Sequence, residues 1–258
     1  MKIISYNVNG IRAAMNKGLI DWLKEENPDV ICFQEVKAEE NQVALDEFHK
    51  LGYENIYWFS AQKKGYSGVA VASKVKAVGY SKGMGVEAYD NEGRTIKVDF
   101  PDFSLINAYF PSGTSGEERQ QFKYSFLEDF NHYIDGLKSD QPNLVICGDF
   151  NICHKPIDIH NPVSNKNSSG FLPEEREWVT DFMEKREFQD AFRSFVEAPH
   201  RYSWWTYRAG ARKNNKGWRI DYFMVANSMK DKMTNSDILD QVVHSDHCPV
   251  MLQLHCQN

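Results

Sequence analysis

The feature that most restricts the fold of this chain is a series of short, β-branched apolar runs spread along its whole length. Most of them are of a length that suits a buried strand and are too short for a buried helix. The runs are Ile3-Ile4, 30–33, 68–73, 95–100, 104–110, 143–150, 219–225 and 249–255. So many strands are too much sheet for a doubly wound fold, and two packed sheets with helices outside fit better.

Segments with helical periodicity separate some of these runs. Apolar residues over 19–23 share one helix face, and Pro28 would end that helix. A second helix, reaching to about Leu137, is expected to open at Ser115, with Glu118 in the position of a capping box. A third is expected to begin at Pro173 and to run through Met183. With no repeat or low-complexity linker between them, we expect one catalytic domain over 1–258.

The composition is that of a soluble globular protein, with 41% hydrophobic and 26% charged residues. No apolar run is long enough to cross a bilayer, and the N-terminal residues do not form a signal peptide. The five cysteines include no CxxC pair, and Cys32 and Cys147 lie inside apolar runs. This pattern indicates a reduced protein, so we expect it in the cytoplasm and expect no membrane partner.

The net charge of −6 argues weakly against a polyanionic partner, but the charge is uneven. The segment 198–220 has no acidic residue, and its basic residues are Arg201, Arg208, Arg212, Lys213, Lys216 and Arg219. Its aromatic residues are Tyr202, Trp204, Trp205, Tyr207 and Trp218. Basic residues interleaved with rings suit a nucleic-acid backbone with bases or sugars against the rings. A solvated loop around core tryptophans is the alternative.

Polar side chains gather where the predicted strands end. They include Asn7, Glu35, Tyr109, Asp149, Asn151, Asp221, Asp246 and His247. Any one of them has an ordinary explanation, because Asn and Asp commonly occupy turns. If two sheets stack, however, these ends can converge on one rim. There they would form an oxygen-rich cluster for a hard cation, with acid–base groups beside it.

A set of motifs gives this pattern a specific resemblance. NVNGIRA, FQEVK, KKGYSGVAV, NAYFP, GDFN, SGFLPEER, GWRIDYF and SDHCP occur in this order. Over Lys2 to about Leu254, the chain resembles the exonuclease III family of abasic-site DNA endonucleases, within the DNase-I-like superfamily. The resemblance implies a four-layer α/β sandwich of two packed mixed β-sheets flanked by helices. It also implies cleavage of the DNA backbone 5′ to an abasic site, leaving a 3′-hydroxyl.

The same resemblance implies 3′-phosphatase, 3′-phosphodiesterase and 3′→5′ exonuclease activities. The expected partner is double-stranded DNA containing abasic sites or blocked 3′ ends, bound by a monomer. Three alternatives remain at this point. They are a specialised 3′→5′ exonuclease of the same family, a non-DNA phosphoesterase of the superfamily, and a DNA-binding module without activity.

Phosphodiester hydrolysis requires a nucleophile, charge stabilisation and help for the leaving group. Glu35 is a suitable ligand for Mg²⁺, with Mn²⁺ as a substitute, and Asn7 can add a neutral oxygen. Asp149 is the best candidate for the base that activates water, and Asn151 can orient that water or donate to developing charge. The full set of expected metal ligands is Asn7, Glu35, Asp149, Asn151, Asp246 and His247.

Two further catalytic roles follow from the resemblance. Tyr109 faces the scissile phosphate, and its phenol would need a depressed pKa to act as a phenolate at neutral pH. His247 donates to a phosphate oxygen while Asp221 orients its other nitrogen, and Asp246 faces the metal. A zinc site of His244, His247 and Cys248 competes with this interpretation, but its spacing matches no standard zinc pattern. His244 also stands where a glycine is common in the family.

Contacts to DNA are likewise implied by the resemblance. Residues that grip the backbone or order the site are Arg12, Lys37, Lys64, Gly65, Tyr66, Asn161 and Asn165, with Arg208 from the basic segment. Trp204, Trp218 and Ile220 form a pocket for a flipped-out deoxyribose, with ordinary core packing as the alternative. The segment 112–115 has no long amide or arginine side chain that could reach into DNA.

Overall fold

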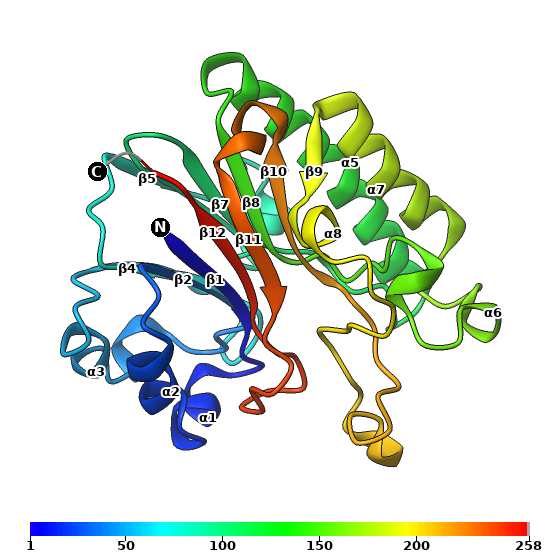
Figure 1. Ribbon diagram of the computed structural model, residues 1–258, viewed down its shortest axis with the longest axis horizontal. Coiled ribbons are helices and arrows are strands. Elements are labelled where there is room, and N and C mark those ends of the chain that lie inside the picture. The colour runs from blue at the N-terminus through cyan, green and yellow to red at the C-terminus, as the bar shows by residue number, and fades with distance from the viewer. Residues whose placement is uncertain (257–258) are drawn as a thin grey trace.

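Two six-stranded sheets pack face to face, and helices cover their outer sides, in the computed structural model, which describes residues 1–256 (Figure 1). The strands of the first sheet are β1 (Lys2–Asn7), β2 (Val30–Gln34), β3 (Asn55–Phe59), β4 (Val69–Ser73), β11 (Met233–Ile238) and β12 (Val250–Leu254). Their order is β11-β12-β1-β2-β4-β3. The strands of the second sheet are β5 (Gly79–Lys82), β6 (Thr95–Asp99), β7 (Ser104–Tyr109), β8 (Leu144–Asp149), β9 (Phe188–Asp190) and β10 (Asp221–Ala226). Their order is β5-β6-β7-β8-β10-β9.

The helices belong to the two outer layers or to the connections. They are α1 (Ile11–Asn16), α2 (Leu19–Glu26), α3 (Asp46–His49), α4 (Glu87–Asp90), α5 (Glu117–Asp140), α6 (Pro162–Asn165), α7 (Pro173–Arg186) and α8 (Ala191–Phe195). The apolar faces of α1, α2 and α3 pack on the first sheet, and those of α5 and α7 pack on the second. The predicted four-layer α/β sandwich is therefore confirmed. No helix in residues 1–256 is long and apolar enough to cross a membrane.

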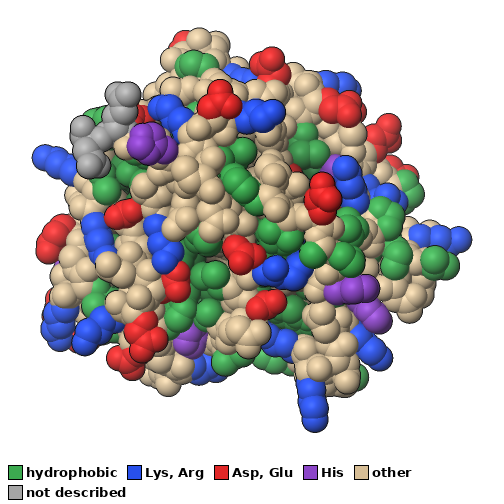
Figure 2. Space-filling view, in the orientation of Figure 1, with side chains coloured by type: hydrophobic (Ala, Val, Ile, Leu, Met, Phe, Trp, Pro, Cys, Tyr) green, Lys and Arg blue, Asp and Glu red, His purple; other side chains and the backbone are tan. Residues whose placement is uncertain are grey.

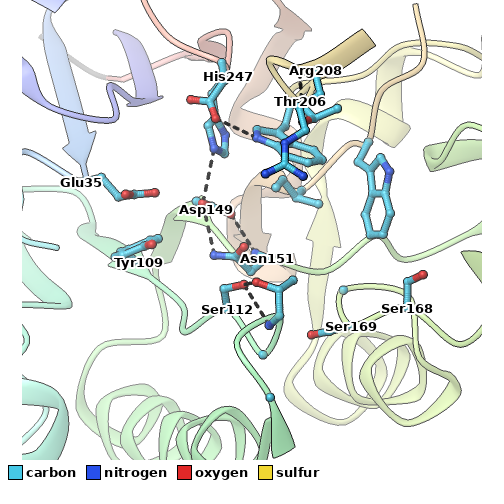
Figure 3. A pocket seen from close by; sticks show the side chains of 18 residues that line it. Glu35, Tyr109, Ser112, Asp149, Asn151, Ser168, Ser169, Thr206, Arg208 and His247 are labelled. Atoms are coloured by element: carbon cyan, nitrogen blue, oxygen red, sulfur yellow. Dashed lines mark hydrogen bonds and ion pairs between the residues drawn. The ribbon is translucent and has the colours of Figure 1, made fainter. Parts of the chain in front are cut away.

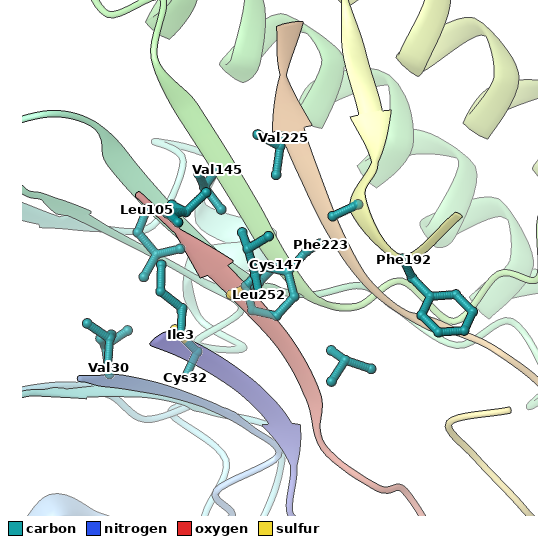
Figure 4. Close-up of a cluster of buried hydrophobic side chains, with 14 of the residues drawn as sticks. Ile3, Val30, Cys32, Leu105, Val145, Cys147, Phe192, Phe223, Val225 and Leu252 are labelled. Carbon is teal, nitrogen blue, oxygen red and sulfur yellow. The ribbon is translucent and has the colours of Figure 1, made fainter. Parts of the chain in front are cut away.

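The main core lies between the sheets and is built from the apolar runs that the sequence displays. Ile3, Cys32, Val145, Cys147 and Leu252 are fully buried there, with side chains from both sheets interleaved (Figure 4). Each of these central strands has one face in this core and the other under helices. Continuous apolar runs are the result of that double burial.

The expected start of the second helix is wrong. Helix α5 begins at Glu117 with Gly116 at its N-cap, so Ser115 and Glu118 form no capping box. Gly116 has φ 115°, a conformation that glycine adopts at low cost, and no side chain caps the helix. Glu117 and Glu118 lie in the first turn, where carboxylates interact favourably with the helix dipole.

The topology brings the polar strand ends to one rim of the sandwich. β1 and β2 run parallel, so Asn7 lies beside Gln34, and β7 and β8 run parallel, so Tyr109 lies beside Asp149. β10 runs antiparallel to β8, which sets Asp221 opposite Asp149. Because the two sheets stack, these ends face one another across the rim.

Candidate active site

Four side chains form the centre of this rim, and we call Glu35, Asp149, Asp221 and His247 the site cluster. Figure 3 shows Glu35, Asp149 and His247 facing the same space from different elements. Asn7 joins the two sheets beneath them, since its Nδ2 donates to Glu35 Oε1 and to Asp149 Oδ2, each at 2.9 Å. Its Oδ1 accepts from the backbone N–H of Asn9 at 3.0 Å. Asn7 thus presents hydrogens to the cluster, not the oxygen expected of a metal ligand.

The loop that carries Glu35 is held in an unusual backbone conformation. Asn9, Glu35 and Lys37 have φ of 45°, 50° and 51°, which costs free energy for residues other than glycine. Backbone hydrogen bonds from Gly10 N to Glu35 O at 2.8 Å and from Val36 N to Gly68 O at 3.1 Å hold the loop. Lys37 Nζ lies 2.8 Å from Glu35 Oε2. The carboxylate is therefore fixed in place, and Lys37 pairs with it inside the site.

His247 is positioned and charged by the carboxylates around it. Its Nδ1 donates to Asp221 Oδ2 at 2.9 Å, and Ser203 Oγ donates to the same oxygen at 2.6 Å. Burial alone would lower the pKa of His247, but Asp221 and Asp149 outweigh it and raise the pKa to about 10. The imidazole is therefore an imidazolium near neutral pH, with Nε2–H aimed toward Asp149 Oδ2 at 3.8 Å.

Asp149 is almost fully buried, and its surroundings favour the neutral form of the carboxyl group. Burial together with the Asp221 and Glu35 carboxylates raises the pKa of Asp149 to about 7, although His247 opposes the rise. Asn151 N donates to Asp149 Oδ1 at 2.8 Å. Asn151 Nδ2 donates to Phe110 O at 2.9 Å and to Asp149 Oδ2 at 3.3 Å. Both amide hydrogens of Asn151 are thus engaged, so its oxygen is the atom suited to accepting from a water.

The phenol of Tyr109 does not have the depressed pKa that a phenolate role requires. Burial and the Glu35 carboxylate raise the pKa of Tyr109 above its ordinary value. The Arg94 guanidinium, whose carbon lies 4.8 Å from the centre of the Tyr109 ring, opposes this shift without reversing it. In this field of charges Tyr109 is a neutral hydroxyl.

The donor atoms of the cluster fit a hard divalent cation. Ligand atoms of Glu35, Asp149 and His247 all lie within 4.8 Å of one another. Asp221 Oδ1 is a buried carboxylate oxygen without a hydrogen-bond partner. Carboxylate oxygens favour Mg²⁺ or Mn²⁺, whereas the two ring nitrogens of His247 already face the carboxylates of Asp221 and Asp149. The residues suited to holding the ion are therefore Glu35 and Asp149.

Asp246 is not among the residues whose ligand atoms come together, which are Glu35, Asp149 and His247. Its carboxylate accepts from Asn9 Nδ2 at 2.9 Å and from Trp204 Nε1 at 3.1 Å. The competing zinc set is not assembled. His244 packs against the rings of Tyr6 and Trp22, and buried Cys248 directs its Sγ to a backbone carbonyl.

An apolar wall adjoins the cluster in the same cleft, which has a volume of about 790 Å³ (Figure 3). Trp204, Trp218 and Ile220 line it, as the sequence predicts. The two indole rings stand nearly perpendicular, with centroids 6.1 Å apart. Phe171 packs against the same residues. We did not single it out from the sequence, although it lies in the motif SGFLPEER.

The basic segment divides into two parts with different roles. Arg219 is fully buried and pairs with Asp158 and Asp190. Arg201 pairs with Asp237. Arg212 donates to the backbone carbonyls of Asp240, Val242 and Ser245. The prediction of a DNA-facing surface is therefore wrong for Arg219, which is fully buried, while Arg201 and Arg212 are half-buried and held by contacts within the protein. Arg208, Lys213 and Lys216 are exposed. Figure 2 shows Lys and Arg side chains that project at the lower edge of the molecule.

The other expected DNA contacts lie outside the cleft lining. Arg12, Lys64 and Asn161 are exposed. Gly65 has φ 70°, and the neighbouring Tyr66 hydroxyl accepts hydrogen bonds from two arginines. Asn165 Nδ2 donates to the backbone oxygens of His160 and Asn161. None of these residues is among those that line the cleft.

Comparisons with known proteins agree with this geometry. The model of the Endonuclease/Exonuclease/phosphatase family matches residues 4–247. The chain is 44% identical to an exodeoxyribonuclease of Bacillus subtilis, with 98% of each chain covered. It is 40% identical to the DNA repair nuclease APEX1 of Danio rerio, over 98% of this chain and 82% of that protein.

Among solved structures, an AP endonuclease from Archaeoglobus fulgidus superposes with a TM-score of 0.88 at 30% identity, covering 99% of this chain and 100% of that one. The relatives are nucleases that act on DNA, which sets aside a non-DNA phosphoesterase and a DNA-binding module without activity. The chain therefore belongs to the Endonuclease/Exonuclease/phosphatase family, in which it is a DNA-repair nuclease of the exonuclease III type.

Proposed function

We propose that the protein hydrolyses the phosphodiester bond 5′ to an abasic site in duplex DNA and leaves a 3′-hydroxyl. The observation that carries this proposal is that Glu35, Asp149 and His247 of the site cluster share one cleft with the apolar wall. We further propose that the same site removes 3′ phosphates and other 3′ blocks and acts as a 3′→5′ exonuclease. The names of the relatives, which include exodeoxyribonucleases and AP endonucleases, support this range.

The site residues divide the chemical work. Asp149 takes the proton from the attacking water, because its burial and the neighbouring Asp221 and Glu35 carboxylates raise its pKa and so favour proton uptake. Asn151 orients that water through its amide oxygen. The His247 imidazolium, oriented by Asp221, donates to a phosphate oxygen, and the neutral Tyr109 hydroxyl donates at the leaving-group side.

We propose Mg²⁺ as the cofactor, with Mn²⁺ as a substitute. Glu35 and Asp149 would hold it, while Asn7 and Asp246 fix the surrounding side chains. When bound, the ion supplies positive charge to the phosphate oxygens in the transition state.

Recognition of an abasic site needs a surface that fits a sugar without a base. We propose that a flipped-out deoxyribose packs on the wall of Trp204, Trp218 and Ile220, which line the cleft, and that a nucleotide that keeps its base does not make this fit. Backbone phosphates are bound by exposed cations and amides around the cleft. We assign Arg12, Lys64, Gly65, Tyr66, Asn161, Asn165 and Arg208 to this surface, with Lys37 as a link to Glu35.

We propose that one domain over 1–258, in which both sheets contribute residues to the site, acts as a monomer on double-stranded DNA. A cytoplasmic location is supported by the five cysteines, all of which are free.

The direct test is incubation with a duplex that holds one tetrahydrofuran abasic analogue, in Mg²⁺ and in EDTA. We expect a single cut 5′ to the analogue that depends on the ion. A protein that leaves this strand intact and degrades a recessed 3′ end would be a specialised 3′→5′ exonuclease.

The role of the apolar wall is tested by Trp204→Ala. We expect a larger loss on the abasic duplex than on a 3′-phosphate, because a terminal phosphate depends less on the fit of a flipped sugar. The measurement is the ratio of the two activities in variant and parent at matched thermal stability. An unchanged ratio would identify Trp204 as ordinary packing.

A further inference from the structure

A buried arginine lies behind Tyr109 and has no role in the chemistry described so far. Arg94, the residue before β6, is 1% exposed. Its Nε donates to Glu92 Oε2 at 2.6 Å, its Nη1 to Tyr109 O at 2.8 Å and its Nη2 to Tyr66 Oη at 3.2 Å. Its guanidinium also lies over the Tyr109 ring, 4.8 Å from the centroid. All three nitrogens, and one face of the group, are therefore used.

A second arginine completes this arrangement. Arg119, on α5, donates to Tyr66 Oη at 3.3 Å and to both oxygens of Glu92, at 3.1 Å and 3.3 Å. We call Tyr66, Glu92, Arg94 and Arg119 the Arg94 unit. It contains two guanidiniums and one carboxylate, so it leaves positive charge beside the site.

The unit has a consequence for the Tyr66 hydroxyl. Its oxygen accepts from two guanidiniums, which uses both of its lone pairs. The hydroxyl hydrogen must then point away from the arginines, where it can donate to an anion. Donors on both sides also polarise the O–H bond and strengthen it as a donor.

The unit has a second consequence for Tyr109. The guanidinium covers one face of the ring and holds the carbonyl of the same residue, so ring and backbone are fixed together. A lysine could keep the positive charge, but a single ammonium cannot reproduce a planar fork that reaches three partners and stacks on a ring.

We propose that Arg94 is a positioning residue for the nuclease reaction, which fixes Tyr109 at the reacting phosphate and turns the Tyr66 hydroxyl toward a neighbouring phosphate before DNA binds. The proposal rests on the proposed roles of Tyr109 and Tyr66. It makes two separable claims, since Tyr109 acts on kcat and Tyr66 acts on KM.

The test is Arg94→Lys, assayed on the tetrahydrofuran duplex with Mg²⁺. We expect kcat to fall on the order of 10- to 100-fold, as for small displacements of reacting groups. The effect on kcat should largely vanish in a Tyr109→Phe background, and any effect on KM should vanish with Tyr66→Phe. If Arg94→Lys lowered kcat equally in the parent and in the Tyr109→Phe background, Arg94 would act through the fold in general, and the proposal would be overturned. An unchanged kcat in Arg94→Lys would also overturn it.

A matched control exists far from the cleft. Arg186, on α7, is also largely buried, donates to Asp135 and lies over the Phe182 ring. Arg186→Lys makes the same chemical change and should leave kcat and KM unchanged. A loss there equal to that of Arg94→Lys would also overturn the proposal.

A second variant covers the case in which Arg94→Lys does not fold. Arg119→Lys removes one of the two donors to Tyr66 from a partly exposed position. We expect KM to rise in the parent background and not in Tyr66→Phe, and equal changes in both would overturn the claim for Tyr66. If the parent does not cut the abasic duplex, the proposed function fails, and the same cycles on a recessed 3′ end still test Arg94.

Discussion

Two clusters of buried charge lie on either side of the start of β10, and they differ in how their charges are balanced. In the site cluster, Asp149 and Asp221 share the single imidazolium of His247. In the other, which we call the Asp158 cluster, the carboxylates of Asp158 and Asp190 meet the guanidiniums of Arg193 and Arg219.

The balance of charge decides the protonation of each aspartate. Burial would raise the pKa of Asp158, but Arg219 and Arg193 outweigh it and lower the pKa to about 2. Asp149 is equally buried, and its pKa is about 7. A balanced cluster holds the fold together, whereas an unbalanced one favours the arrival of a cation or a proton. The balance of buried charge therefore distinguishes the structural Asp158 cluster from the catalytic site cluster, although both contain aspartates.

The largest effect is expected from Asp149→Asn. We expect kcat to fall by about 10²- to 10⁴-fold through loss of the proton acceptor. The free energy of unfolding should stay equal or rise, because an unbalanced buried carboxylate is removed. Steady-state kinetics and urea denaturation measure the two quantities. Asp221→Asn should cost less in kcat, since it only loosens His247, and a larger loss at Asp221 would reverse the two roles.

The corresponding change in the Asp158 cluster is Asp158→Asn. It leaves Arg219 and Arg193 without their shared carboxylate, so we expect a loss of about 3–5 kcal/mol in the free energy of unfolding. Urea denaturation at pH 7 measures it. If Asp149→Asn were the more destabilising variant, the contrast between the two clusters would be wrong.

The pH dependence of stability sharpens the same contrast. The pKa of Asp158 is about 2 in the folded protein, compared with 3.8 for an unperturbed aspartate, which we take for the unfolded chain. The ionised carboxylate therefore stabilises the fold above pH 3.8, and this contribution is lost as the pH falls through 2. It amounts to roughly 2.5 kcal/mol. The difference in stability between the parent and Asp158→Asn should shrink from pH 5 to pH 2, and a constant difference would contradict the assignment.

The smallest expected effect is stabilisation by the cation. Mg²⁺ at ten times its Kd should raise the free energy of unfolding of the parent by about 1.4 kcal/mol, and EDTA should abolish the rise. Thermal denaturation with and without Mg²⁺ measures it. Glu35→Ala should lose this response together with most activity, whereas Asp158→Asn should keep the response. An equal response in Glu35→Ala would remove Glu35 from the metal site.

The strands show how far sequence patterns reach. The predicted strands are present as β1, β2, β4, β6, β7, β8, β10 and β12. The strands that were missed, β3, β5, β9 and β11, are the edges of the two sheets. An edge strand is only partly buried, so it needs no continuous apolar run, and its sequence carries a weaker signal.

The basic segment shows where prediction from sequence stops. Arg208 and Arg219 belong to the same run of basic and aromatic residues, yet one is exposed and the other is fully buried. The difference comes from Asp158, which is 61 residues from Arg219 in the chain and in contact with it in the fold. A contact between residues so far apart in the chain leaves no signal in the local sequence around either of them.

The sequence by itself determined the layered architecture and the residue types that gather at one rim, because strand periodicity and parallel pairing make such ends converge. Only the tertiary structure decided the protonation of His247 and Asp149, the direction of the Asn7 amide and the burial of Arg94. Those properties depend on which charges and donors lie within a few ångströms, and that proximity arises only when the two sheets pack together.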